Sequence, residues 1–326
     1  MNSKNKQADK SVRYYAYSKY LEEKYGERVY KLPVNLPITC PNRDGTCSYG
    51  GCIFCGDVGA AFENLPSTMP VKEQIKENMD FIGKKYKANK FIAYFQNFTN
   101  TYMPLEEFKK NILEAVTDNV VEVAVSTRPD CIKDEYMAFL SEVKQKYGIN
   151  ISIELGLQSV NYKTLKIINR GHTLAEFIDA CLTIRKYGFD ICAHIILNLP
   201  WDDMSDTIEC AKIISALGVK QVKLHSLYIV KDTPIAKMYL NGEFDMGTYM
   251  DYVDRVITFL EYLSDKVVIQ RLIGRAKEEH TIFSNYGASW WKIKDTIDEE
   301  MEKRCAYQGR LCTYLDGSAL RKFFLG

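Results

Sequence analysis

The sequence predicts an α/β fold in which six strand–helix units form a parallel sheet curved into a full or partial barrel. Short runs of β-branched and aromatic residues alternate with amphipathic helical stretches. From residue 91 onward the runs start about 30 to 40 residues apart, which is typical of parallel strands joined by helical crossovers. The strand-like runs cover residues 29–39, 91–97, 120–126, 149–156, 190–198 and 219–227.

The helices between these runs carry recognisable end signals. Pro104 precedes Leu-Glu-Glu, which places acidic residues in the first turn of a helix. Thr173 can cap the helix that Gly188 ends, and Asp202 or Asp203 can cap the next one. These signals support helices between the fourth, fifth and sixth runs.

Polar side chains recur where the predicted strands end. In a parallel α/β barrel the carboxyl ends of the strands carry the chemistry. Any one of these residues could be a helix cap or a turn residue, but five consecutive strand ends favour a functional site. The residues are Gln96, Asn100, Thr127, Arg128, Glu154, Gln158, Ser159, His194, Asn198, His225 and Ser226.

The composition excludes some classes of protein. Lys and Arg total 43 against 42 Asp and Glu, so net charge indicates no polyanionic partner for the whole chain. Residues 1–31 nevertheless hold eight basic and four acidic side chains. No apolar run reaches the roughly 20 residues of a membrane helix, and the polar N-terminus lacks a signal peptide. We therefore expect a cytoplasmic protein with no membrane partner, whose ten cysteines bind metal or are buried.

The pattern changes after residue 245. A helical stretch at 247–264 leads to a short apolar run at 267–272 and then to a segment rich in aromatic and charged residues. We predict an N-terminal basic and aromatic extension (1–28), a barrel (29–245) and a C-terminal helical extension packed on the barrel (246–326).

The segment from Cys40 to Cys55 is the strongest chemical signal. It contains Cys40, Cys47, Cys52 and Cys55 on a glycine-rich loop. Three thiolates can hold three irons of a [4Fe–4S] cluster, and the open fourth iron can chelate the amino and carboxylate groups of S-adenosylmethionine (SAM). We expect Phe54, between the last two cysteines, to pack against the adenine.

Two other metal or redox interpretations compete for this segment. A zinc knuckle would use all four cysteines in a C-x6-C-x4-C-x2-C pattern. A thioredoxin-like redox pair would use the C-x2-C alone, but it lacks the βαβ context of that fold. The predicted barrel directly after the loop favours the iron–sulfur interpretation.

Seven short segments in this order resemble radical SAM proteins of the YhcC/YtqA type, which are relatives of the catalytic subunit of Elongator. The resemblance spans residues 28–240. The segments are CPNRDGT at 40–46, GCIFC at 51–55, YFQNFTNT at 94–101, STRPDC at 126–131, ELGLQS at 154–159, NRGHT at 169–173 and NLP at 198–200.

This resemblance implies a partial (βα)6 radical SAM barrel with short terminal extensions. It also implies a [4Fe–4S] cluster and SAM as cofactors. In the family, eleven residues separate the first cysteine from the C-x2-C pair, which selects Cys40, Cys52 and Cys55 as the ligands. Cys47 is then a bystander.

The resemblance further implies which residues bind SAM. The stretch from Gln96 to Thr101 falls where the family binds the methionine amino group, and Glu154 falls where a ribose contact is expected. If Glu154 is buried, a ribose hydroxyl or a basic neighbour must satisfy it. Arg170 and His172 could instead form a loop salt bridge or a cap. The full set of expected cofactor contacts is Phe54, Gln96, Asn100, Thr101, Glu154, Gln158, Arg170 and His172.

The relatives are associated with the wobble uridine of tRNA. The hypothesis for this chain is a radical SAM enzyme acting on a C5-substituted wobble uridine, trimming carboxymethylaminomethyl to aminomethyl. A small-molecule substrate such as a tetrapyrrole, or a non-catalytic zinc- or RNA-binding module, are the alternatives. Expected partners are tRNA, an electron donor such as flavodoxin or ferredoxin, and a downstream methyltransferase. Nothing in the chain matches the acetyltransferase domain of Elongator's catalytic subunit.

Two aromatic and basic segments could contact RNA by stacking on bases and pairing with phosphates. One runs from Arg13 to Tyr20, and the other contains Trp290, Trp291 and Lys294. The tyrosines also lie at helical spacing, so they could simply dock a helix on the barrel.

Overall fold

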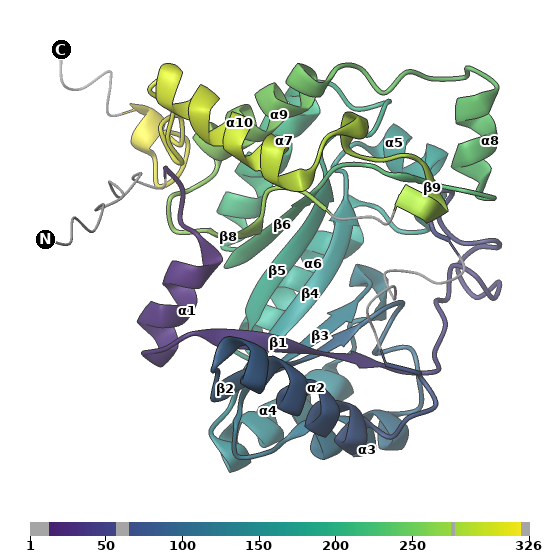
Figure 1. The fold of residues 1–326 in the computed structure, drawn as a ribbon, viewed down its shortest axis with the longest axis vertical. Helices are drawn as coiled ribbons and strands as arrows, with labels where there is room; N and C mark the ends of the chain where they lie inside the picture. Colours follow the sequence, from purple (N-terminus) through teal and green to yellow (C-terminus); the bar gives the residue numbers. More distant parts are fainter. Residues whose placement is uncertain (1–12, 57–64, 275–277, 321–326) are drawn as a thin grey trace, which may run out of the picture.

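The computed structural model describes residues 13–56, 65–274 and 278–320. A seven-stranded parallel sheet in the order β1-β2-β3-β4-β5-β6-β8 curls into half of a barrel (Figure 1). The predicted partial α/β barrel is therefore confirmed. The strands are β1 (Val29–Asn35), β2 (Lys90–Gln96), β3 (Val120–Thr127), β4 (Asn150–Gln158), β5 (Asp190–Ile196), β6 (Gln221–His225) and β8 (Val268–Arg271).

Helices cover the outer face of the sheet. Aromatic side chains such as Phe91, Phe108, Phe177 and Phe259 are fully buried between the two layers. Because both faces of a parallel sheet are covered, its strands read as apolar runs rather than as strict alternation. The helices that follow the strands are α2 (Val71–Tyr86), α3 (Leu105–Ala115), α4 (Asp134–Tyr147), α5 (Tyr162–Ile167), α6 (Leu174–Lys186), α7 (Met204–Ala216) and α9 (Tyr249–Tyr262).

The predicted helix caps can be checked one by one. Thr173 caps α6 in a capping box with Glu176, and Pro104 occupies the N-cap of α3. Of the two candidate caps for α7, Asp203 accepts hydrogen bonds from the first turn. Asp202 is buried instead. Gly188 follows α6 with φ of 64°, a left-handed conformation that glycine adopts without steric cost.

The sheet extends beyond the six predicted units. The apolar run near residue 268 forms β8, which pairs in parallel with β6 through Gln221 and Val268. A short antiparallel pair, β7 (Ile229–Val230) with β9 (Thr281–Phe283), and the helix α8 (Pro234–Leu240) pack a second apolar cluster against Ile53 and Phe54. This cluster gives the cysteine loop an apolar surface to pack against.

The helix α1 (Tyr17–Tyr25) lies between the two edge strands, β1 and β8 (Figure 1). Tyr20 and Leu21 are buried against the barrel, which confirms that these two residues dock the helix. Tyr25 Oη donates a 2.6 Å hydrogen bond to Glu122, near the amino end of β3. Lys24 Nζ lies 3.3 Å from the same carboxylate. The helix thus plugs the amino end of the barrel.

The N-terminal segment is tied to the C-terminal one. Gln308, which follows α10 (Trp290–Lys303), is buried and accepts a 2.8 Å hydrogen bond from the backbone of Tyr15. Its Nε2 donates to the carbonyls of Ser264 and Val267, both at 2.7 Å. One side chain therefore joins three segments that are far apart in the sequence. Residues 1–12 of the predicted basic extension lie outside the described residues.

Among residues 13–56, 65–274 and 278–320, no helix has both the length and the apolar character needed to cross a lipid bilayer.

We expect Gln308→Leu to lower the free energy of unfolding by about 3 kcal/mol, because it leaves one backbone donor and two carbonyls buried without partners. Urea denaturation followed by circular dichroism measures this. Gln145→Leu, at an exposed position of α4, is the control and should change stability by less than about 0.5 kcal/mol. Equal stability of the two variants would contradict the proposed joining role.

Candidate active site

The concave face of the sheet encloses a cavity of about 1340 Å³. Side chains from all seven strands line it, including Lys31 of β1, Gln96 of β2, Glu154 of β4, Lys223 of β6 and Arg271 of β8. Trp290, Trp291 and Lys294 of α10 line the cavity as well. It is large enough for a cofactor and part of a substrate.

Three of the four clustered cysteines reach this cavity. Cys40, Cys52 and Cys55 line it, whereas Cys47 is exposed and does not. The sequence-selected triad is therefore the set that the fold brings to the cavity. Its role as a ligand set stays a prediction.

Each of the three sulfurs has a guanidinium N–H donor. Positive charge and N–H donors stabilise a thiolate, which is the form that binds metal. The contacts are Arg128 Nη1 to Cys40 Sγ at 3.9 Å, Arg170 Nη1 to Cys52 Sγ at 3.4 Å and Arg43 Nη2 to Cys55 Sγ at 3.8 Å. These arginines come from three different parts of the chain, so the fold concentrates positive charge on this loop.

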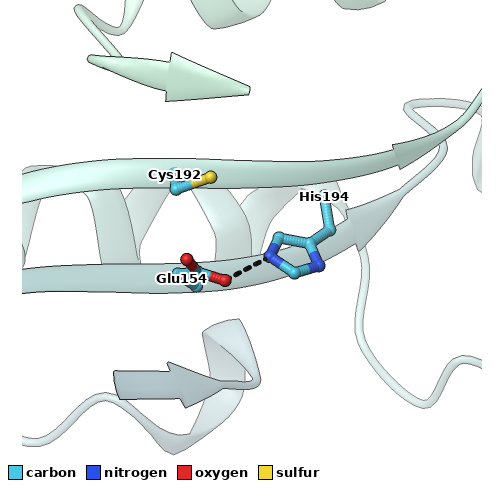
Figure 2. Close-up of side chains that lie close together, drawn as sticks. All are labelled: Glu154, Cys192 and His194. Atoms are coloured by element: carbon cyan, nitrogen blue, oxygen red, sulfur yellow. Dashed lines mark hydrogen bonds and ion pairs between the residues drawn. The ribbon is translucent and has the colours of Figure 1, made fainter. Parts of the chain in front are cut away.

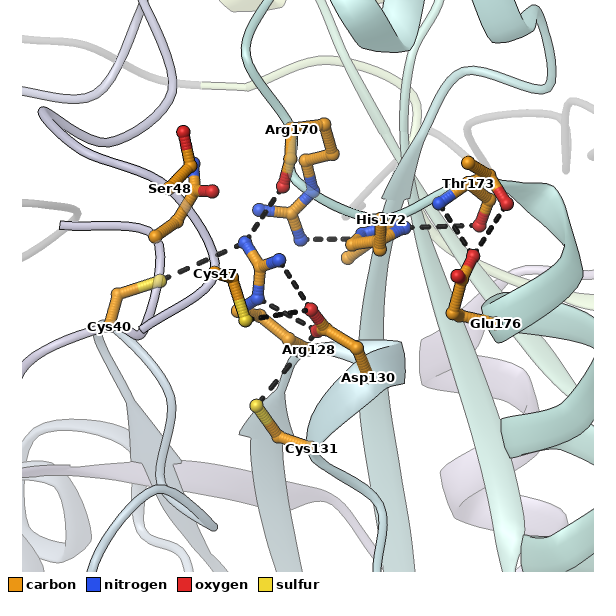
Figure 3. A network of polar contacts seen from close by, with 12 residues as sticks. Cys40, Cys47, Ser48, Arg128, Asp130, Cys131, Arg170, His172, Thr173 and Glu176 are labelled. Carbon is orange, nitrogen blue, oxygen red and sulfur yellow. Dashed lines mark hydrogen bonds and ion pairs between the residues drawn. The ribbon is translucent and has the colours of Figure 1, made fainter. Parts of the chain in front are cut away.

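Cys47 is in a different electrostatic environment. Its thiol donates to Asp130 Oδ2 at 3.7 Å (Figure 3). Desolvation and the Asp130 carboxylate raise the pKa of Cys47. Arg128 holds that carboxylate through two short contacts, Nε to Oδ1 at 2.8 Å and Nη2 to Oδ2 at 2.7 Å. Burial also raises the pKa of the Cys55 thiol, so a raised pKa alone does not separate the two cysteines. Cys47 fits a bystander because it is exposed, lies outside the cavity and has a carboxylate rather than a guanidinium as its partner.

The sulfur spacing also bears on the zinc alternative. A tetrahedral zinc ion with Zn–S bonds of 2.3 Å holds its sulfurs about 3.8 Å apart. Among the described residues, no three of these four cysteines bring their sulfurs within 4.8 Å of one another. A multi-iron cluster holds its cysteine sulfurs farther apart than a single zinc ion does. The spacing of these sulfurs therefore fits such a cluster better than it fits zinc.

A second polar centre lies deeper in the cavity around Glu154. Figure 2 shows Glu154 on β4 beside Cys192 and His194 on β5, and these three are close enough to suggest a cation site. Lys31 Nζ, however, lies 2.5 Å from Glu154 Oε1, and Lys223 Nζ contacts Oε2. Two ammonium groups already compensate the single carboxylate, so no metal ion is assigned here.

These neighbours explain why Glu154 can be buried. Burial alone would raise the pKa of Glu154, but Lys223, Lys31 and His194 hold it well below its usual range. Burial and Lys223 lower the pKa of His194 to about 4, so its neutral ring donates from Nε2 to Glu154 Oε2 at 2.8 Å. Basic neighbours therefore satisfy the carboxylate. The expected ribose contact stays a prediction.

The NRGHT segment holds the cysteine loop in place. Asn169 Nδ2 donates to the carbonyls of Tyr49 at 3.0 Å and Gly51 at 2.8 Å, and its Oδ1 accepts from Ser48 Oγ at 2.8 Å. The approach is closest at Gly171, where a Cβ atom would lie 2.2 Å from Asn42 Oδ1. This segment therefore acts as a clamp on the loop.

Arg170 and His172 belong to this clamp. Arg170 Nη2 donates to the carbonyl of Gly156 at 2.7 Å, in addition to its contact with Cys52. The His172 ring lies 3.1 Å from the carbonyl of Thr173 (Figure 3) and 3.2 Å from that of Gly156. It does not line the cavity. Burial and two nearby arginines lower the pKa of His172 to about 3. The predicted contact of His172 with SAM or substrate has no support in this geometry.

The other expected cofactor contacts fall into two groups. Phe54, Gln96 and Gln158 line the cavity. Asn100 and Thr101 are buried outside it: Asn100 Nδ2 donates to the carbonyl of Ser126 at 2.9 Å, and Thr101 Oγ1 donates to the carbonyl of Cys131 at 2.7 Å. Both side chains thus fasten the segment that follows β2 to the carboxyl end of β3. A direct SAM contact by either stays an expectation that the described geometry does not support.

Sequence reasoning missed Arg43, Lys31, Lys223 and Arg271 as cavity residues. Lys31 and Lys223 each interrupt an apolar strand-like run, and a lysine is rarely buried unless it is paired. A lysine within each of two apolar runs could therefore have predicted ion pairs inside the barrel. Arg43 and Arg271 carried no comparable signal.

Comparison with protein families gives two matches. Residues 43–214 match the model of the radical SAM superfamily, and residues 219–303 match a radical SAM C-terminal domain. The chain is 33% identical to YtqA of Bacillus subtilis over 93% of its own length and 94% of that protein. It is 31% identical to YhcC of Escherichia coli over 79% of its own length and 82% of that protein.

More distant similarities extend to a tRNA-modifying protein. The chain is 24% identical to the tRNA uridine(34) acetyltransferase of Methanocaldococcus jannaschii over 61% of its own length and 43% of that protein. The solved structure of Methanocaldococcus infernus Elp3, lacking its N-terminus, superposes with a TM-score of 0.65 at 17% identity. That match covers 86% of this chain and 64% of that one. It shows a shared fold.

We expect Cys55→Ala to bind far less iron than the unchanged chain after anaerobic reconstitution with iron and sulfide, because the loop loses one of three cavity-facing thiolates. Cys47→Ala is the matched control and should keep its iron and its brown colour. Iron analysis and the visible spectrum measure both. Equal loss of iron in the two variants would contradict the three-cysteine set.

We expect Gly171→Ala to lose most of its iron, since the new methyl group would collide with Asn42 and push the clamp off the loop. Gly188→Ala is the control that separates this collision from backbone strain. Gly188 has a similar φ, 64° as against 75° at Gly171, but a Cβ atom added there would meet no atom within 4 Å. That control should lose about 1 kcal/mol of stability and keep its iron. Normal iron content in Gly171→Ala would disprove the clamp.

Proposed function

Because the chain belongs to the radical SAM superfamily, we propose that it acts on the C5 side chain of a modified wobble uridine in tRNA. The specific reaction proposed is trimming of carboxymethylaminomethyl to aminomethyl. The main support for an RNA substrate is the arrangement of aromatic and basic side chains around the cavity.

The residues around the cavity fit the cofactors of the superfamily, a [4Fe–4S] cluster and SAM. Cys40, Cys52 and Cys55 would hold the cluster, with the three arginines beside their sulfurs. Phe54, Gln96 and Gln158 are the cavity residues that would contact SAM. When bound, this pair of cofactors supplies a 5′-deoxyadenosyl radical through reductive cleavage of SAM.

Two segments nearly 280 residues apart in the sequence meet at the cavity. Tyr14 and Tyr17 of the N-terminal segment line it together with Trp290, Trp291 and Lys294 of α10. Trp291 is 60% exposed, and its ring lies against Trp290 with centroids 3.4 Å apart. Single-stranded bases bind by stacking on such exposed rings. A nucleobase turned out of an anticodon loop would stack on these rings.

The charge at the cavity favours a polyanion. Among the described residues that line it, eight are basic and only Glu22 and Glu154 are acidic. The net charge of the whole chain is only +1, so basic side chains are concentrated here. RNA phosphates approaching the opening would therefore meet a positive potential.

The relatives support the same substrate class from another direction. The tRNA uridine(34) acetyltransferase carries its substrate in its name, and this chain matches part of it. The Elp3 structure shares the fold. Acetyl transfer is not part of the proposal.

The side chains of this chain would orient the substrate rather than supply the radical. One side of the cavity is lined by an ion-paired cluster of Glu154, Lys31 and Lys223. Because these side chains hold one another in place, a uracil ring packed against them would have a fixed position. His194, held neutral and donating from Nε2, leaves Nδ1 as a hydrogen-bond acceptor. Such an acceptor can take a hydrogen bond from the amine of the uridine side chain.

The first test measures 5′-deoxyadenosine from the reconstituted protein with SAM and dithionite, with and without bulk tRNA. We expect tRNA carrying the modified uridine to raise its yield, and nucleoside mass spectrometry to identify the altered base. Formation that ignores tRNA would move the search to small molecules such as a tetrapyrrole and would overturn the RNA proposal.

The second test addresses the aromatic opening. We expect Trp291→Ala to weaken tRNA binding about tenfold at constant salt, because one stacking surface is lost. Phe81→Ala, on the outer helix α2 and 65% exposed, is the matched control and should bind normally. Filter binding over a salt series measures both. Equal affinities would exclude Trp291 as a base contact.

A further inference from the structure

Building on the proposed function, we propose that Arg271 and His225 form a subsite that binds an anionic group of the substrate. The chemical class is a carboxylate or a phosphate, since both present paired oxygens to a guanidinium fork. With a modified tRNA as substrate, that group is either the carboxylate on the uridine side chain or a backbone phosphate near it.

Arg271 is an exposed residue of the cavity lining, and most of its guanidinium donors have no partner among the described residues. It ends β8 and lines the cavity together with His225, which ends β6. Arg271 Nη2 lies 2.6 Å from Nε2 and 2.9 Å from Nδ1 of the His225 ring. One nitrogen cannot donate well to both ring atoms, so this contact occupies at most one of the five guanidinium donors.

Arg271 also differs from every other basic residue that lines the cavity within the described part of the chain. The other seven each have a carboxylate, or a carbonyl and a cysteine sulfur, as a partner. These pairs are Arg28 with Glu22, Lys31 and Lys223 with Glu154, Arg128 with Asp130, Lys294 with Asp298, Arg43 with Cys55 and Gly56, and Arg170 with Cys52 and Gly156. Arg271 has no such partner among the described residues.

His225 does not neutralise this charge. Burial and the neighbouring Arg271 hold its pKa well below the usual range, so the ring is neutral. It lies against the His194 ring with centroids 5.5 Å apart. A neutral imidazole next to a guanidinium can donate a hydrogen bond to the second oxygen of a bound anion. The pair therefore offers positive charge together with directed donors.

The subsite can be tested without RNA. The chain has only four histidines, so ring resonances of the histidine-labelled, reconstituted full-length protein can be followed by NMR during titration with inorganic phosphate. We expect the His225 resonance, identified with His225→Gln, to shift in the unchanged protein and in Lys186→Gln, an exposed control on α6. It should not shift in Arg271→Gln. No shift in any variant, or the same shift in all, would overturn the subsite.

The source of the anion is tested with two anticodon stem-loops, without SAM. One carries carboxymethylaminomethyluridine and the other aminomethyluridine, so they differ only in the carboxymethyl group. If the carboxylate is bound, the first should bind about tenfold more tightly, and Arg271→Gln should abolish the difference. If a phosphate is bound, Arg271→Gln should weaken both stem-loops equally.

Arg271→Lys keeps the charge but not the fork, and it should recover only part of the lost affinity. If neither stem-loop binds the unchanged protein, the proposed function fails, while the phosphate titration still decides whether the subsite exists. Normal affinity of Arg271→Gln for both stem-loops would overturn its substrate role. A His225 shift caused by SAM and not by the stem-loops would assign the anion to the cofactor and also overturn it.

Discussion

The packing of the NRGHT segment against the cysteine loop is the constraint on which the site depends. The cysteine loop packs Ile53 and Phe54 against the second apolar cluster, but its remaining residues have little apolar surface with which to fix their shape. The clamp fixes it from outside through the amide of Asn169, the close approach at Gly171 and the contact of Arg170 with Cys52. Arg128 Nη1 in turn donates to the carbonyl of Arg170 at 2.9 Å, so the clamp itself is anchored to the end of β3. A change at Arg128 or in the clamp would therefore shift the positions of the cysteine sulfurs.

Much of this architecture could be predicted from the sequence because it depends on local signals. The apolar runs gave the six strands, and Thr173 gave a helix start, since a cap needs only residues within one turn. The cysteine spacing and the short segments in order gave the triad, and the fold brings the same three sulfurs to the cavity. The role of β8 was less visible. Its four residues, Val268–Arg271, have meaning only through pairing with β6.

The parts that escaped prediction depend on contacts between distant residues. Lys31, Glu154 and Lys223 lie on three different strands, and only the curl of the sheet brings them to one point. The same holds for Asn100 and Thr101, which look like site residues by position but turn toward backbone carbonyls. Which face a polar side chain takes after a strand end depends on the local turn, and the motif does not specify it.

The junction at Gln308 has a consequence for biosynthesis. The backbone of Tyr15 receives its partner from a residue near the other end of the sequence, and the backbone N–H of Gln308 donates to the carbonyl of Arg13 at 3.0 Å. During translation, the contacts of Tyr25 and Lys24 with Glu122 become available early, whereas these two hydrogen bonds need almost the whole chain. The segment before α1 therefore gains its partners only when synthesis of the chain is nearly complete.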